Sequence, residues 1–212
     1  MILGRIIGKS STTHFTFLVH GNAKKFNYVE VLDEEGHDVL AQIVEIERDN
    51  NETIADCVLF GYRDGGKLKP LLRPLVPGRE VLLASESLIM QVLGLEQEKK
   101  RGYIGLLDGY DQISVHLDLA TLLTTHVLIL AKSGSGKSYC SAVLIEELLD
   151  YKVPVVIIDP HGEYSTLKYS NDEDKELMIK FGVTPKDYFN FIQEYSPISE
   201  INPEAKPLKL SL

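Results

Sequence analysis

The 212-residue chain has little cysteine, and its two cysteines stand far apart. Cys57 and Cys140 belong to no C-x-x-C motif and to no Cys/His cluster, which excludes the common zinc-site patterns and a disulfide framework. An apolar run of about eighteen residues is also missing, and Arg5 and Lys9 interrupt the first apolar segment. We therefore expect a cytoplasmic protein with free thiols and no membrane partner.

The chain also lacks an excess of basic over acidic residues. The net charge is −9, which argues against a generally basic nucleic-acid-binding surface but not against a basic lining confined to one channel. Scattered basic residues in a proline-rich loop are more often simply solvated. Four residues are nevertheless candidates for such a lining: Lys67, Lys69, Arg73 and Arg79.

Residues 1–93 are predicted to form a small β domain. Short apolar segments alternate there with turns rich in glycine and aspartate, and the run VEIE at residues 44–47 alternates with period two, as half-buried strands do. Several strands at this spacing indicate a barrel or a sandwich. Residues 67–79 hold too much proline for a central strand and are expected to be a connecting loop. The charged stretch LEQEKKRG at residues 95–102 is expected to be an exposed joint.

Residues 94–212 have the pattern of an α/β domain. YIGLL and ISVHL are predicted to form a hairpin around DGYD. The uninterrupted runs VLIL (127–130) and VVII (155–158) are typical of buried parallel strands, and we expect them to be neighbours joined by a helix over residues 139–150. Further helices are predicted in NDEDKELMIKF (171–181) and TPKDYFNFIQEY (184–195).

The octapeptide AKSGSGKS at residues 131–138 lies between the first of these runs and that helix. Strand, glycine-bearing loop and helix in this order are the context of a phosphate-binding loop. Gly134 and Gly136 can take positive φ, so that successive N–H groups turn inward and surround an anion. Lys137 would reach the β- and γ-phosphates, and the Ser138 hydroxyl would coordinate Mg²⁺. A flexible surface loop with a solvated lysine is the alternative, which the flanking pattern disfavours.

A second motif, DPHGEY at residues 159–164, comes directly after the second apolar run. Locally it satisfies the rule for a type I turn, with Asp159 first, proline second and glycine fourth, and as a turn alone it needs no function. Ligands of α/β sheets, however, bind outside the carboxyl ends of the strands. A carboxylate of Asp159 or Glu163 could hold Mg²⁺ or orient the attacking water, and His161 could sense the γ-phosphate.

The string from YIGLLDGYDQ to LAKSGSGKSY, together with VPVVIIDPHGEY, resembles the archaeal HerA family, hexameric DNA translocases of the FtsK–HerA group of P-loop ATPases. The resemblance implies a HAS-barrel at residues 1–93 and a partial, truncated RecA-like ATPase domain at residues 94–212. It implies duplex DNA and a NurA-type nuclease as partners, and ATP with Mg²⁺ as cofactors. It assigns metal binding to Ser138 and Asp159 and catalysis to Lys137, Asp159 and Glu163. The nucleotide contacts it implies are Lys132, Ser133, Gly134, Ser135, Gly136, Lys137, Ser138, Tyr139 and His161.

Three features depart from the family pattern. Ala131 replaces the first glycine of the phosphate loop, and Thr125 stands where an arginine is expected. After Tyr164 the chain offers no apolar strand ending in Asp-Glu and no arginine acting in trans. We therefore expect the N-terminal portion of a longer polypeptide, which binds nucleotide but hydrolyses it slowly when alone.

Two classes of function remain open. One is an ATP-driven motor, a hexameric ring that pulls duplex DNA through its pore with a nuclease docked on the barrel. The other is a non-hydrolysing module that mediates oligomerisation or partner docking and keeps a vestigial nucleotide site.

Overall fold

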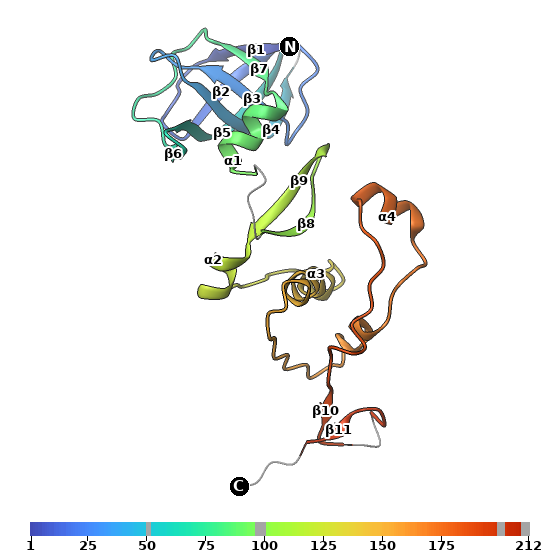
Figure 1. The fold of residues 1–212 in the computed structure, drawn as a ribbon. Helices are drawn as coiled ribbons and strands as arrows, with labels where there is room; N and C mark the ends of the chain where they lie inside the picture. The colour runs from blue at the N-terminus through green and yellow to red at the C-terminus, as the bar shows by residue number, and fades with distance from the viewer. Residues whose placement is uncertain (50–51, 96–100, 199–201, 209–212) are drawn as a thin grey trace. The chain divides into compact units, whose positions relative to one another are not determined.

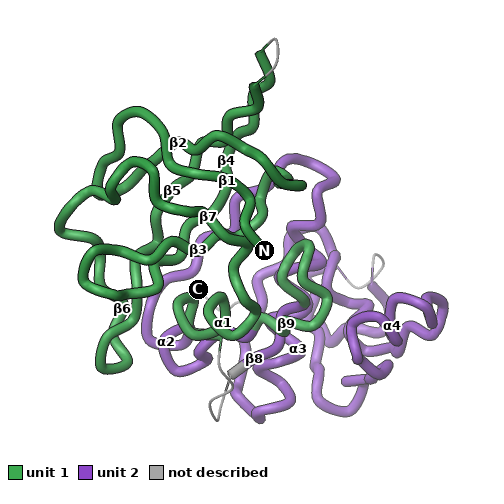
Figure 2. The backbone as a smooth tube through the Cα atoms, turned by 90° about the horizontal axis from the view of Figure 1, so that it is seen from above, with its two compact units in different colours: residues 1–98, 106–115 green, residues 99–105, 116–212 purple. Residues whose placement is uncertain are grey.

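A computed structural model describes residues 1–49, 52–95, 101–198 and 202–208. The chain divides into two compact units (Figure 2), one of residues 1–98 and 106–115 and the other of residues 99–105 and 116–212. The expected joint lies mostly at residues 96–100, outside the described residues. Each unit is described by itself below.

The first unit is a closed antiparallel barrel (Figure 1). Its ring has the order β2-β1-β7-β3-β4-β5, and pairing of β2 with β5 closes it, so these six strands leave no ring edge unpaired. A short seventh strand, β6, pairs with β5 outside the ring. This confirms the predicted small N-terminal barrel. The strands are β1 Ile2–Ile7, β2 His14–Val19, β3 Tyr28–Leu32, β4 Asp38–Asp49, β5 Glu52–Asp64, β6 Lys67–Lys69 and β7 Glu80–Leu83.

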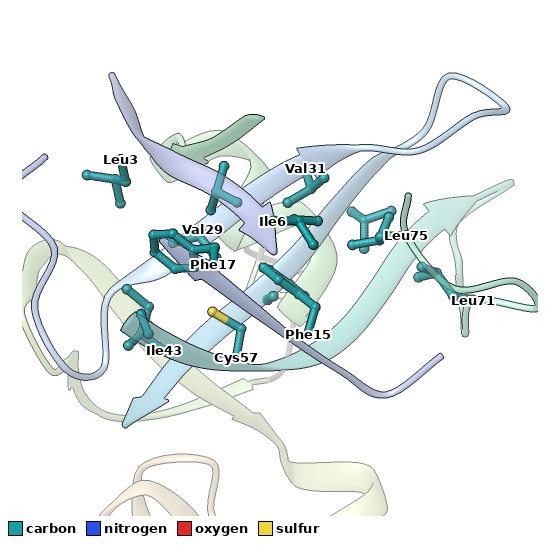
Figure 3. Close-up of a cluster of buried hydrophobic side chains, with 14 residues drawn as sticks. Leu3, Ile6, Phe15, Phe17, Val29, Val31, Ile43, Cys57, Leu71 and Leu75 are labelled. Atoms are coloured by element: carbon teal, nitrogen blue, oxygen red, sulfur yellow. The ribbon is translucent and has the colours of Figure 1, made fainter. Parts of the chain in front are cut away.

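Alternating side chains fill the barrel interior (Figure 3). On β4, Val39, Ala41 and Ile43 are fully buried in the main core, because every second side chain of a strand points to the same face. The proline-rich loop after β6 contributes Leu71 and Leu75 to this core. The loop prediction therefore holds from residue 70 onward, although its first three residues form β6.

A second apolar cluster lies on the outside of the same strands. Leu40 of β4 packs there with Ile89 of helix α1 (Glu86–Leu93) and with Ile113 of the hairpin. The hairpin consists of β8 (Arg101–Leu107) and β9 (Tyr110–Asp118), as predicted from DGYD. Helix α1 was not expected, although the Ser85 hydroxyl accepts a hydrogen bond from the Leu88 amide at its start and left-handed Gly94 ends it.

The second unit is mostly helices and extended segments. Its longest helix, α3, begins at Lys137 and confirms the helix predicted after the phosphate loop. No described helix of the chain is long and apolar enough to cross a membrane. The elements after the hairpin are α2 Leu119–Thr124, α3 Lys137–Asp150, the 3₁₀ helix η1 Ser165–Lys168, α4 Lys175–Phe181, β10 Tyr195–Ser196 and β11 Lys206–Pro207.

The expected parallel strands are not formed. Residues 127–130 and 155–158 belong to no strand, and most of their side chains are exposed, with Leu130 at 83% and Val156 at 92%. A parallel strand is stable when neighbouring strands pair with it and helices cover both faces. Among the described residues of this unit, no such neighbours are present, so the prediction of a two-stranded parallel pair was wrong.

The helix expected at residues 184–195 is also absent. Within this segment, Tyr188 is buried and its hydroxyl donates to Asp150 at the end of α3, and Lys186 contacts the same carboxylate. These contacts fix the segment in a non-helical path, so tertiary contacts override its local helix pattern. The other predicted helix is present as α4, which is shorter than residues 171–181, with Asp174 at the N-cap position and no side-chain cap hydrogen bond.

Candidate nucleotide-binding site

The loop before α3 has the backbone of an anion-binding turn. Gly134 has φ +77° and Gly136 has φ +90°, which confirms the expected left-handed conformations. The Ser135 amide and hydroxyl both donate to the Lys132 carbonyl, at 3.2 and 2.7 Å, and thereby close the loop. Residues 131–137 are all exposed, so the loop is open to a ligand.

The amino end of α3 continues this site. Gly136 is its N-cap, no side chain caps it, and its first turn holds no acidic residue. The first amides of a helix have no partner within the helix, and the helix dipole adds partial positive charge at that end. The start of α3 can therefore bind an anion, and Lys137 adds a full positive charge at its first position.

Helix α3 is anchored along its length. Leu144 and Leu148 are buried, and the Glu147 carboxylate accepts a hydrogen bond from the Tyr103 amide of β8 at 3.0 Å. At its carboxyl end Asp150 accepts from the Tyr188 hydroxyl at 2.9 Å. Burial, with help from the Asp150 carboxylate, raises the pKa of Tyr188, so the hydroxyl stays a donor. Sequence reasoning missed these anchors, because no motif marks them.

The DPHGEY motif forms a tight turn around its first side chain. The Asp159 carboxylate accepts hydrogen bonds from the amides of His161, at 3.3 Å, and Tyr164, at 3.0 Å. Partial burial raises the pKa of Asp159, but the backbone amides of the turn lower it more, so it lies below its ordinary value. Gly162 has φ +69°, which allows the chain to reverse here.

A side-chain pair joins the turn to the phosphate loop. The Ser138 hydroxyl donates to Oε2 of Glu163 at 2.6 Å, across 25 residues of sequence. Two residues predicted for the same site are therefore in contact. His161 is exposed, and its side chain has no hydrogen-bond partner among the described residues, while Tyr139 is 75% exposed.

The turn is held in place by the 3₁₀ helix η1, which begins directly after Tyr164. Leu167 and Lys168 of η1 are buried, and Lys168 forms an ion pair with Glu194 at 3.2 Å. Burial raises the pKa of Glu194, but hydrogen bonds from Asn202 and Lys168 lower it by more. The pKa therefore lies below its ordinary value, and Glu194 remains a carboxylate. The chain after Tyr164 thus has its own anchor.

An all-protein metal site is not present in the described part of the chain, where no three His, Cys, Asp or Glu side chains gather. Mg²⁺ does not require one, because it is commonly held by one or two protein oxygens, nucleotide phosphates and water. The adjacent oxygens of Ser138 and Glu163 could supply these one or two protein ligands. Within the described residues both cysteines are free, Cys57 buried and Cys140 exposed.

Two of the four basic candidates on the barrel lie beside acidic residues. Lys67 and Lys69 are exposed on β6. Arg73 and Arg79 line a hollow together with three acidic residues, Asp33, Glu34 and Glu35. The barrel charges therefore do not by themselves indicate a DNA-binding face.

Comparison with known proteins identifies the family. Residues 102–206 match the family described as "Helicase HerA, central domain". The "Probable DNA double-strand break repair helicase HerA" of Methanocaldococcus jannaschii is 32% identical over 189 residues, which are 87% of this chain and 36% of the relative. The chain belongs to the HerA family.

Two more HerA relatives support this. The "DNA double-strand break repair helicase HerA" of Pyrococcus furiosus is 29% identical over 157 residues, 74% of this chain and 26% of the relative. The protein of the same name from Sulfurisphaera tokodaii is 33% identical over 129 residues, 60% of this chain and 25% of the relative. The chain thus spans about a quarter to a third of the length of these HerA proteins. The family resemblance inferred from the phosphate loop and DPHGEY is confirmed.

Proposed function

We propose that this chain binds Mg·ATP and is the nucleotide-binding part of an ATP-driven DNA helicase or translocase. The observation that carries the proposal is the uncapped amino end of α3. It lies directly after two left-handed glycines and begins with Lys137 and Ser138. Amides, helix dipole and lysine charge together match a triphosphate.

Each residue of the site has a proposed role. The amides of residues 132–138 surround the phosphates, Lys137 contacts the β- and γ-phosphates, and Ser138 binds Mg²⁺ together with a carboxylate of the DPHGEY turn. Mg²⁺ would neutralise charge between the phosphates. Tyr139, which follows Ser138, and His161, which lies within the DPHGEY turn, are both exposed. We propose that both contact the nucleotide.

The DNA-related part of the proposal comes from the family. The relatives are named as DNA double-strand break repair helicases, so we propose duplex DNA as the partner on which ATP energy is used. A homohexameric ring and a NurA-type nuclease docked on the barrel complete the proposal, in line with the family resemblance. DNA end processing would then be the biological role.

The phosphate-loop proposal is tested by titrating the chain with a fluorescent ATP analogue in the presence of Mg²⁺. Lys137→Ala removes a charge-assisted contact of about 1.5–3 kcal/mol, so the Kd should rise about 10- to 150-fold. Lys175→Ala, at the exposed start of α4, is the matched control and should bind like the wild type. Equal affinity of the Lys137→Ala variant and the wild type would show that the loop does not bind the phosphates.

A further inference from the structure

We infer that Glu163, and not Asp159, faces the bound divalent cation with Ser138, and that Asp159 is a positioning residue that shapes the turn. The inference rests on the proposed Mg·ATP site and assigns its carboxylates. The motif alone left both carboxylates open as Mg²⁺ ligands, and the family resemblance assigned Asp159. The contacts of the two side chains favour the opposite division of roles.

Glu163 already lies where the cation ligand is needed. Its Oε2 is 2.6 Å from the Ser138 hydroxyl oxygen. Neighbouring oxygens around an octahedral Mg²⁺, each about 2.0–2.1 Å from the ion, are about 3 Å apart. A shift of a few tenths of an ångström in the exposed Glu163 side chain therefore lets both oxygens contact one ion.

The hydrogen bond between them also suits this role. The hydroxyl of Ser138 donates a hydrogen bond to the carboxylate and keeps its lone pairs available for a cation. A hydroxyl that also accepted a hydrogen bond would have one lone pair fewer to offer the ion. This donor direction therefore leaves oxygen lone pairs on both side chains for a cation.

The Asp159 carboxylate is occupied differently. Its two oxygens accept from the amides of His161 and Tyr164, so part of its capacity of about four acceptor sites is already used inside the turn. These hydrogen bonds close the chain over residues 159–164, and left-handed Gly162 completes the reversal. The closed turn directs Glu163 toward Ser138, so Asp159 acts through the backbone.

Manganese, a paramagnetic substitute for Mg²⁺, gives a test that does not depend on turnover. Binding of Mn²⁺ is measured by the loss of its free EPR signal, and binding of the fluorescent ATP analogue is measured with Mn²⁺ and with EDTA. Glu163→Gln should weaken Mn²⁺ binding to the nucleotide complex at least about 10-fold, since loss of even an outer-shell partner costs about 10- to 100-fold in metal affinity. Nucleotide binding in EDTA should stay equal or become tighter, because a carboxylate near the phosphates is removed.

Matched variants separate a ligand from a structural residue. Glu163→Asp keeps the carboxylate and should restore part of the Mn²⁺ affinity, whereas Glu176→Gln on exposed α4 should have no effect. Asp159→Asn should increase hydrogen exchange at the Tyr164 amide, because it removes an acceptor of the turn. Its loss of Mn²⁺ affinity should be smaller than that of Glu163→Gln.

The outcomes distinguish the two proposals. Absence of nucleotide binding by the wild type would overturn the proposed function and the inference together. Normal nucleotide binding with unchanged Mn²⁺ affinity in Glu163→Gln would overturn the inference alone. So would a complete loss of Mn²⁺ binding in Asp159→Asn with unchanged exchange at Tyr164, because Asp159 would then be the ligand itself.

Discussion

Backbone conformation at single residues determines the candidate site. Gly134 and Gly136 have φ of +77° and +90°, values that cost other residues about 1–2 kcal/mol each. Both lie in open space, where an added Cβ would meet no atom within 4 Å. The requirement for glycine at these positions is therefore conformational and not steric.

Gly136→Ala should accordingly weaken nucleotide binding without a packing defect. Strain of about 1–2 kcal/mol at the N-cap of α3 should lower affinity about 5- to 30-fold. Gly182→Ala is the control, since Gly182 has φ +64° at the carboxyl end of α4 and lies outside the site. Both variants should lose similar stability in urea unfolding. Equal loss of nucleotide affinity in the two variants would mean that the effect reports stability only.

The backbone of the candidate site could be predicted from the sequence, but the contacts between its side chains could not. Positive φ at the two glycines and the start of α3 could be expected from local rules that relate sequence to backbone. The pairing of Ser138 with Glu163 depends on how a turn closes 25 residues later, and on amide hydrogen bonds to Asp159 that no sequence pattern specifies. A local motif indicates which residues take part in a site. How two motifs contact each other depends on the tertiary structure.

At the scale of elements, each strand of the barrel ring forms backbone hydrogen bonds with a neighbour on both sides. The pairing of β2 with β5 closes the ring, and the proline-rich loop covers part of the core with Leu71 and Leu75. Alternation along the strands was readable from the sequence. Helix α1 was missed although Ser85 and Gly94 are ordinary cap residues, because its eight residues are too short for a clear periodicity.

The barrel core should dominate the stability of its unit. Leu3 is fully buried and Leu72 is 88% exposed, so the same Leu→Ala change tests the core and the surface. Leu3→Ala should cost about 2–5 kcal/mol, and Leu72→Ala should stay within about 0.5 kcal/mol of the wild type. The chain has no tryptophan, so urea unfolding should be monitored by far-UV circular dichroism. Similar costs for both leucines would contradict the closed core.

At the scale of the whole molecule, the exposed apolar runs at residues 127–130 and 155–158 bear on whether the nucleotide site can catalyse hydrolysis or only bind nucleotide. Leu128, Leu130 and Ile158 are 79%, 83% and 90% exposed on segments that precede the phosphate loop and the DPHGEY turn. Their sequence predicted strands, but pairing requires partners that the described residues do not supply. Binding of phosphates needs only the loop and α3. Catalysis needs groups held within about 0.5 Å of the productive geometry, which rigid elements provide.

We therefore expect the 212-residue chain to bind Mg·ATP but to hydrolyse it slowly. Phosphoryl transfer depends on positioned charges around the γ-phosphate, and lack of a single trans arginine can cost about 10³ to 10⁵ in rate. A polypeptide of full family length should supply further strands and charges and show turnover stimulated by DNA. In that polypeptide, Glu163→Gln should abolish hydrolysis while nucleotide still binds.

Steady-state phosphate release, with and without duplex DNA, checks this expectation for both lengths of chain. Slow release by the 212-residue chain at saturating Mg·ATP, together with fast DNA-stimulated release by the longer one, is the expected pair of results. Robust DNA-stimulated release by the 212-residue chain would mean that Lys137, Ser138 and the carboxylates of the turn suffice for catalysis. Absence of release at both lengths would instead favour a module that uses bound nucleotide only for assembly or docking.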